Sequence, residues 1–152
     1  MYRRILSAID ATPHAQTVLA HTQYLAQLSA ARVHVLHVHS LRAVHAGLPL
    51  VAAATAGVAI ASLPPADFTV GARQLVDHAV AQLAAAGLTT TGEILDARED
   101  RAAELILQRA EDLAVQLIVL GAQHRRRLLA SLRPTVTDQV CRQLRCPVLV
   151  IP

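Results

Sequence analysis

The chain has 152 residues, of which 53% are hydrophobic and 16% are charged, and its formal net charge is +3. This length fits a single domain over residues 1–152, and the composition excludes an intrinsically disordered chain. Aromatic residues make up 2% and Trp is absent, so the aromatic platforms that stack single-stranded bases are missing and we expect no nucleic-acid partner.

The first predicted elements are a strand, a helix and a second strand. The apolar run Ile5–Ile9, followed directly by Asp10, is typical of a buried strand. Thr12 is positioned to cap a helix over residues 13–28, where apolar residues recur at helical spacing. The run Val33–Val38 is rich in β-branched residues, which predicts the second strand.

An alanine-rich segment, Leu48–Leu63, comes next. It contains Pro49 and Gly57 and falls short of the ~20 strongly apolar residues that cross a membrane, so we expect no membrane contact. We interpret it as a connection, with an apolar partner surface as the alternative. Residues 1–30 show no secretory signal, so a cytoplasmic location is expected.

Helix and strand patterns alternate in the second half of the chain. A helix is expected to end near Gly87, which suits a left-handed C-cap, and Thr89–Leu95 is expected to form a strand although Gly92 is unfavourable inside one. The remaining predicted elements are a helix opened by Asp100, a strand at Leu117–Leu120, a helix from Val136 to about Leu144 and a strand at Val148–Ile151.

This alternation predicts the fold class. Short apolar strands separated by helices indicate right-handed crossovers and a parallel sheet. We therefore predict an α/β fold with one doubly wound sheet of five parallel strands and helices on both faces. Ligands of such sheets bind at the carboxyl ends of the strands, at the switch point. Asp10, Val38 and the segment after Gly121 are expected there.

The opening stretch Ile5–Asp10, the stretch Leu36–Val38 and the closing stretch Cys146–Val150 together resemble the universal stress protein family, over essentially the full chain. The resemblance implies a fold like that of the adenine nucleotide alpha hydrolases. It also implies a stress-response or regulatory role, a homodimer, and a binding loop for adenine nucleotides after the fourth strand.

That loop is only partly kept. The pattern of the family's nucleotide-binding members is a Gly, two residues, a Gly, nine residues, and a Gly followed by Ser or Thr. It falls here on Gly121, His124, Pro134 and Thr135. Glycines let backbone N–H groups approach phosphate closely, whereas His124 adds a bulky side chain and Pro134 has no N–H to donate. We expect ATP binding to be weakened or lost.

Two interpretations stay open for each polar residue of this site. The resemblance implies that Asp10 bonds the ribose or adenine and that the backbone of Val38 contacts the adenine. Asp10 is equally suited to capping the first helix. Thr135 and Thr137 bind phosphate in one interpretation and cap the last helix in the other.

Two functions follow. In the first, the protein is a non-enzymatic cytoplasmic stress-response or regulatory protein that acts through a regulatory protein partner. In the second, it is a sensor of an adenine nucleotide of the ATP or AMP type, which binds at Asp10 and Val38. Arg125–Arg127 or His124 then replace the missing glycines at the phosphates. Because nucleophile motifs and Lys are absent, we expect no enzyme.

A metal site is not expected from His34, His37 and His39. Side chains alternate along a strand, so His34 faces away from the other two, and two imidazoles without a carboxylate make a poor site.

The last strand predicts the homodimer. The resemblance places it at the sheet edge, where unpaired N–H and C=O groups must be covered or paired. The same strand of a second copy, running antiparallel, satisfies both edges, and Pro152 ends the ladder because it has no N–H. The interface strand comprises Val148, Leu149, Val150 and Ile151.

Overall fold

The computed structural model describes residues 1–40, 66–97, 101–122, 134–143 and 146–152. It confirms the α/β class, since one sheet holds five parallel strands in the order β3-β2-β1-β4-β5. In chain order the elements are β1 (Arg4–Ile9), α1 (Ala15–Ser29), β2 (Arg32–Ser40), α4 (Ala66–Ala85), β3 (Thr90–Ala97), α5 (Ala102–Asp112), β4 (Leu117–Gly121), α6 (Val136–Arg142) and β5 (Val148–Ile151).

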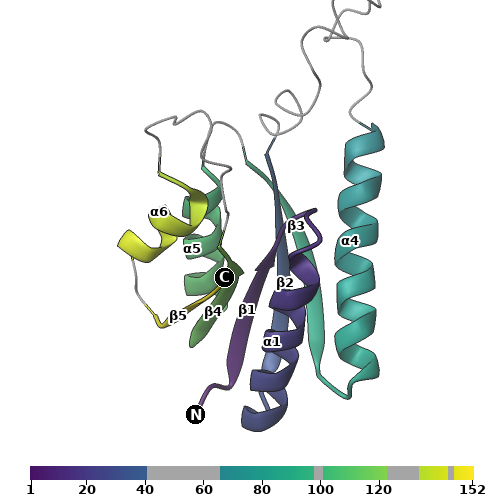
Figure 1. Cartoon of the computed structure of the whole chain (residues 1–152), viewed down its shortest axis with the longest axis vertical. Coiled ribbons are helices and arrows are strands. Elements are labelled where there is room, and N and C mark those ends of the chain that lie inside the picture. The colour runs from purple at the N-terminus through teal and green to yellow at the C-terminus, as the bar shows by residue number, and fades with distance from the viewer. Residues whose placement is uncertain (41–65, 98–100, 123–133, 144–145) are drawn as a thin grey trace, which may run out of the picture.

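Helices cover both faces of the sheet, as predicted. Helices α1 and α4 pack on one face and α5 and α6 on the other (Figure 1). The chain runs outward from β1 to β2 and β3, and then crosses to β4 and β5 on the other side of β1. The strand order therefore reverses between β1 and β4, which is the switch point of the sheet.

Strand β1 shows how the apolar runs build the core. Ile5 and Ile9 pack against α1 and α4, whereas Leu6 packs against α5 and α6. Both faces of the strand are buried, which is why its sequence is almost continuously apolar instead of alternating.

Ser7, the polar exception in β1, is fully buried. Its hydroxyl lies 3.0 Å from the hydroxyl of Thr22, which in turn donates to the carbonyl oxygen of Val18 at 2.8 Å. Because Thr22 uses its proton on Val18, Ser7 donates to Thr22. This pair satisfies the buried hydroxyls and joins α1 to the centre of the sheet.

The predicted start of the first helix is wrong. Helix α1 begins at Ala15, and its N-cap residue, His14, makes no side-chain capping bond. Thr12 instead donates to Asp10: its N–H and its hydroxyl lie 3.1 and 2.6 Å from Oδ1 of the carboxylate. Neither Asp10 nor Thr12 caps the helix, because the two side chains bond each other in a turn that precedes it.

The predicted strand around Gly92 is confirmed, and the structure explains the glycine. A Cβ at Gly92 would lie 2.5 Å from Cγ1 of Val76 and 2.6 Å from Cγ2 of Val80, both on α4. Only glycine lets the helix pack this closely on the strand. Gly87 has a φ of 81° after α4, as expected of a left-handed cap.

Some predictions fall outside the described residues, namely those for Leu48–Leu63, Asp100 and Leu144. Among the helices that are described, none combines the length and the apolar character needed to cross a membrane.

Candidate functional site

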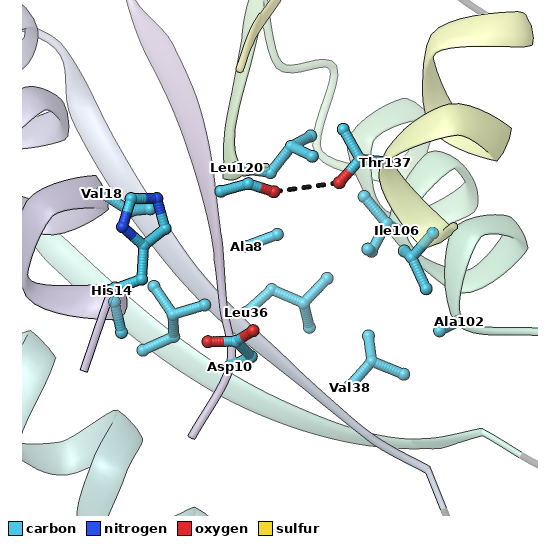
Figure 2. Close-up of a pocket in the computed structure, with 14 residues that line it drawn as sticks. Ala8, Asp10, His14, Val18, Leu36, Val38, Ala102, Ile106, Leu120 and Thr137 are labelled. Carbon is cyan, nitrogen blue, oxygen red and sulfur yellow. Dashed lines mark hydrogen bonds between the residues drawn. The ribbon is translucent and has the colours of Figure 1, made fainter. Parts of the chain in front are cut away.

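A pocket opens at the carboxyl ends of β1 and β4, where the strand order reverses. Its volume within the described part of the chain is about 80 Å³. The walls come from the ends of β1, β2 and β4 and from the first turns of α1, α5 and α6. Figure 2 shows His14 and Thr137 on opposite sides of this pocket, with Asp10 at its edge.

The structure brings several of the predicted residues together here. Asp10, Val38, Gly121 and Thr137 all line the pocket. Thr135 precedes α6 and is not part of the lining. His124 and Arg125–Arg127 lie outside the described residues.

The Asp10 carboxylate is held by its neighbour and keeps one oxygen available. Oδ1 accepts both the N–H and the hydroxyl of Thr12. These two bonds fix the orientation of the half-buried carboxylate at the mouth of the pocket. Oδ2 has no hydrogen-bond partner among the described residues, so it can accept a donor from a ligand.

His14 is a pocket residue that the sequence analysis missed. Its Nε2 lies 3.1 Å from the carbonyl oxygen of Ile151 at the end of β5. Because a carbonyl only accepts, Nε2 carries the proton of this hydrogen bond. No motif marks this histidine. Its position four residues after Asp10, just before the first helix, was the one available signal.

Gly121 is closely packed against this histidine. A Cβ at Gly121 would lie 2.8 Å from Cδ2 and 3.3 Å from Nε2 of His14. Gly121 does not have a positive φ, so the reason for a glycine here is space for the imidazole. The glycine that matches the family's phosphate loop thus has a packing role in this chain.

The two threonines differ in role. Thr137 is buried, and its hydroxyl donates to the carbonyl oxygen of Gly121 at 2.9 Å, which joins α6 to the end of β4. Thr135 caps α6 in a capping box with Asp138. The capping interpretation is therefore confirmed for Thr135, and Thr137 makes a different bond.

The capping box occupies the start of α6. The Asp138 N–H donates to the Thr135 hydroxyl oxygen at 3.1 Å, and the Asp138 carboxylate accepts the Thr135 N–H and hydroxyl at 3.0 and 2.8 Å. Hydrogen bonds from the backbone and then the side chain of Thr135 hold the pKa of Asp138 below its ordinary value. A carboxylate therefore stands where an anionic ligand would approach this helix.

The rest of the pocket is mainly apolar. Leu36, Val38, Ile106 and Leu120 contribute aliphatic surface, and the lining contains no Arg or Lys among the described residues. Such a surface suits a flat heterocycle better than a phosphate chain.

The three histidines of β2 do not come together. His37 is buried and donates from Nδ1 to the carbonyl oxygen of Ile9 at 2.9 Å, with the His39 ring 6.4 Å away between centroids. His34 lies on the opposite face and contacts Glu93, as the alternation predicted. The described residues include no group of three or more potential ligands that could hold a metal ion.

The chain matches the model of one family of known proteins. The model of the universal stress protein family matches residues 1–152. No curated protein matches the chain.

The solved structures that are similar in fold include the following three. A universal stress family protein from Burkholderia pseudomallei has a TM-score of 0.72 and 24% identity, covering 99% of this chain and 96% of that chain. The universal stress protein from Archaeoglobus fulgidus, solved with dAMP, has a TM-score of 0.66 and 20% identity, with 99% and 98% coverage. A universal stress protein solved with cAMP has a TM-score of 0.68 and 14% identity, with 99% and 96% coverage.

Proposed function

Since the chain belongs to the universal stress protein family, we propose that it is a non-enzymatic, cytoplasmic regulatory protein of the stress response, a single domain that acts as a homodimer. Its pocket keeps the adenosine half of a nucleotide site and has lost most of the phosphate half, so ATP binds weakly or not at all. The observation that carries this proposal is the capping box of Thr135 and Asp138 at the start of α6.

The adenosine half is supported by the apolar walls and by Asp10. Val38 and Leu36 at the end of β2 offer aliphatic surface to a base. Oδ2 of Asp10 offers an acceptor for a ribose hydroxyl or an adenine amino group, and Thr12 holds the carboxylate in place. The relatives solved with dAMP and cAMP support the same ligand class.

The phosphate half is weakened by three features around α6. The N–H groups of Thr135 and Asp138 already have partners, and Pro134 has none to offer. The Asp138 carboxylate also repels an anion at this position. A triphosphate would have to break the capping box, which contributes about 1 kcal/mol to helix stability in typical cases.

Titration calorimetry with adenosine, AMP and ATP tests this proposal. We expect adenosine and AMP to bind with similar affinity and ATP to bind no more tightly. Asp10→Ala should weaken all three ligands, whereas Asp77→Ala, at an exposed carboxylate on α4, is the control and should change none. A Kd for ATP below ~1 μM, about 8 kcal/mol of binding, would contradict the proposal.

Restoring variants sharpen the same test. Asp138→Asn removes the repelling charge, and His124→Gly combined with Pro134→Gly restores the glycines. Both changes should increase the affinity for ATP and leave that for adenosine unchanged. The alternative function, an adenine-nucleotide sensor, is supported by the pocket at the switch point. It predicts instead that wild-type protein binds ATP tightly and that changing Arg125–Arg127 to Ala abolishes this binding.

The proposed homodimer uses the outer edge of β5, the last strand of the sheet. The carbonyl oxygens of Pro147 and Ile151 accept N–H groups from Ile118 and Ala122. Since backbone groups alternate along a strand, residues 147, 149 and 151 bond to β4, whereas the N–H groups of residues 148 and 150 point outward. These outward groups are the ones that a second copy would pair.

This alternation selects a specific probe of the dimer. Val150→Pro removes an outward N–H and should give a monomer in sedimentation experiments without loss of the circular dichroism spectrum. Val150→Ala keeps the N–H and is the control, while Leu149→Pro should disturb folding because its N–H faces β4. Wild-type protein that sediments as a monomer at micromolar concentration would disprove the dimer.

A further inference from the structure

A second, larger pocket lies at the other end of the strands, where β1, β2 and β3 begin. It has a volume of about 370 Å³ and is bounded by the amino ends of β1, β2 and β3 and by the end of α5. Its Arg4 begins β1, the strand whose other end reaches Asp10. At about 3.3 Å per residue, the two pockets are roughly 20 Å apart. This pocket is therefore separate from the site already described.

Two arginines stand side by side at this pocket. Arg4 and Arg32 are the first residues of β1 and β2, they are partners in the strand register, and both line the pocket. Alternation from Leu6 and Leu36, which pack in the core on the α5 side, puts both side chains on that same face. Neighbouring strands are only about 4.8 Å apart, so the two exposed arginines project from adjacent positions at the same pocket.

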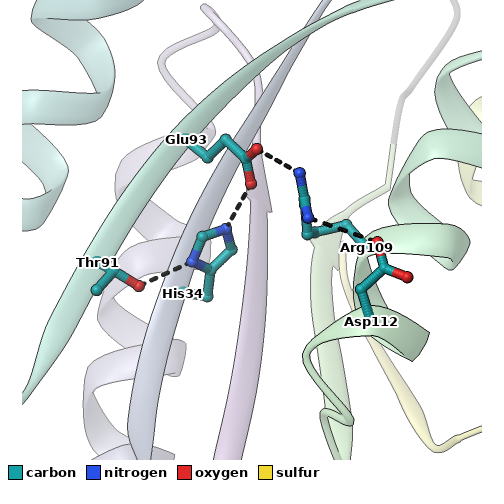
Figure 3. A network of polar contacts seen from close by, with 5 residues as sticks. All are labelled: His34, Thr91, Glu93, Arg109 and Asp112. Atoms are coloured by element: carbon teal, nitrogen blue, oxygen red, sulfur yellow. Dashed lines mark hydrogen bonds and ion pairs between the residues drawn. The ribbon is translucent and has the colours of Figure 1, made fainter.

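The carboxylates on this face do not neutralise the charges of Arg4 and Arg32. Arg109 lies between Glu93 and Asp112, with its guanidinium nitrogens 2.5 and 3.5 Å from their carboxylate oxygens (Figure 3). Glu93 also accepts from Nε2 of His34 at 3.2 Å. Among the described residues, no carboxylate forms an ion pair with Arg4 or Arg32. Asp112 does line the pocket, but its charge is shared with Arg109.

His34 lines the same pocket, and both of its ring nitrogens have hydrogen-bond partners. Nδ1 of His34 lies 2.8 Å from the hydroxyl of Thr91, and Nε2 donates to Glu93. With both nitrogens engaged, the imidazole is fixed in place between β3 and the pocket. Burial, as the largest cause, lowers the pKa of His34, so the ring is neutral at pH 7 and the positive charge of the pocket resides on the two arginines.

We propose that Arg4 and Arg32 form a binding site for a phosphate dianion, either free or as the phosphate group of a small phosphomonoester. Two guanidinium groups provide only donors, and each presents a planar fork that matches phosphate oxygens. Their combined charge matches a dianion, whereas a carboxylate would neutralise only one of them.

Titration of isotopically labelled full-length protein with inorganic phosphate, at ionic strength held constant with chloride, tests the site. The side-chain Nε–H signals of Arg4 and Arg32 and the ring signals of His34 should shift with one saturating curve. Arg4→Gln and Arg32→Gln should each weaken binding about tenfold or more, as expected for charge-assisted bonds, and the double variant should not saturate. Arg3→Gln is the control, because it removes the same charge one residue away from the pocket lining.

The outcomes separate specific binding from general attraction. Equal weakening by Arg3→Gln and Arg4→Gln would reduce the effect to net charge and overturn the proposal, as would the absence of saturation at tens of millimolar phosphate. Shifts confined to Asp10 and His14 would assign phosphate to the other pocket and also overturn it. O-phosphoserine compared with phosphate distinguishes an ester from the free ion. If a glutamine variant unfolds, Arg4→Lys and Arg32→Lys keep the charge, lose the fork and should bind more weakly than wild type.

Discussion

Replacing Gly121 with alanine should displace the His14 ring from the end of β4. The new Cβ would lie 2.8 Å from Cδ2 of His14, 3.3 Å from its Nε2 and 3.4 Å from Cγ2 of Val18. Carbon atoms in contact are normally about 3.5–4.0 Å apart, so the imidazole must move. That movement breaks the hydrogen bond between Nε2 and the carbonyl oxygen of Ile151.

The expected cost follows from these contacts. Loss of the hydrogen bond removes about 1 kcal/mol, and crowding at a packed position adds at least about 1 kcal/mol. Alanine recovers roughly 0.4–1 kcal/mol by restricting the unfolded chain, because the backbone at Gly121 does not need a positive φ. The free energy of unfolding should therefore fall by about 1–2 kcal/mol, with a Tm lower by roughly 2–8 °C.

A double-mutant cycle with His14→Ala tests the cause. Urea unfolding of the four proteins, followed by circular dichroism without nucleotide, gives the coupling energy. When His14 is alanine, the crowding is gone, and Gly121→Ala should become neutral or slightly stabilising. If Gly121→Ala costs the same free energy in both backgrounds, the imidazole is not what requires glycine at this position, and our reasoning is wrong.

Four further predictions concern stability. Gly92→Ala should lower the free energy of unfolding by about 1–3 kcal/mol because its Cβ would meet two valine methyl groups of α4; Gly71→Ala, with nothing within 4 Å, should instead stabilise the protein by about 0.5–1 kcal/mol in the same urea assay. Hydrogen bonds from Thr135 lower the pKa of Asp138 in the folded protein. The ionised Asp138 therefore stabilises the fold above the ordinary Asp pKa of about 4, and this contribution is lost as the pH falls through the folded pKa. Asp138→Asn should remove this acid dependence of the Tm. Burial lowers the folded pKa of His34, so the unfolded chain is protonated first and stability should decrease as pH falls below about 6.5. An unchanged slope in His34→Gln would contradict this assignment.

Much of the fold was predictable because it depends on local patterns. The apolar runs at Val148–Ile151 and Leu117–Leu120 match β5 and, to within one residue, β4. Their continuous apolar character reflects burial on both faces, which only a parallel sheet covered by helices on both sides provides. The switch-point pocket then followed from topology, since Asp10 and Gly121 end neighbouring strands.

Local competition explains the errors near the site. Thr12 has the chemistry of a helix cap, but the carboxylate two residues before it takes both its N–H and its hydroxyl. Helix α1 therefore begins later, at Ala15. As a cap, the Thr12 hydroxyl oxygen would accept an N–H of the helix, whereas here the hydroxyl donates to Asp10. Threonine has the chemistry for both, so residue type alone does not choose between them.

By itself the sequence determined the alternation of strands and helices, the parallel sheet and the edge at which a ligand would bind, because each of these is encoded in the spacing of neighbouring residues. Tertiary structure alone decided what Gly92 and Gly121 are for, and it alone placed His14 against Ile151 and Arg4 beside Arg32. Each of these contacts joins elements that are distant along the chain. Such contacts depend on how the helices pack on the sheet and on the register of the strands, and no local pattern of residues specifies either.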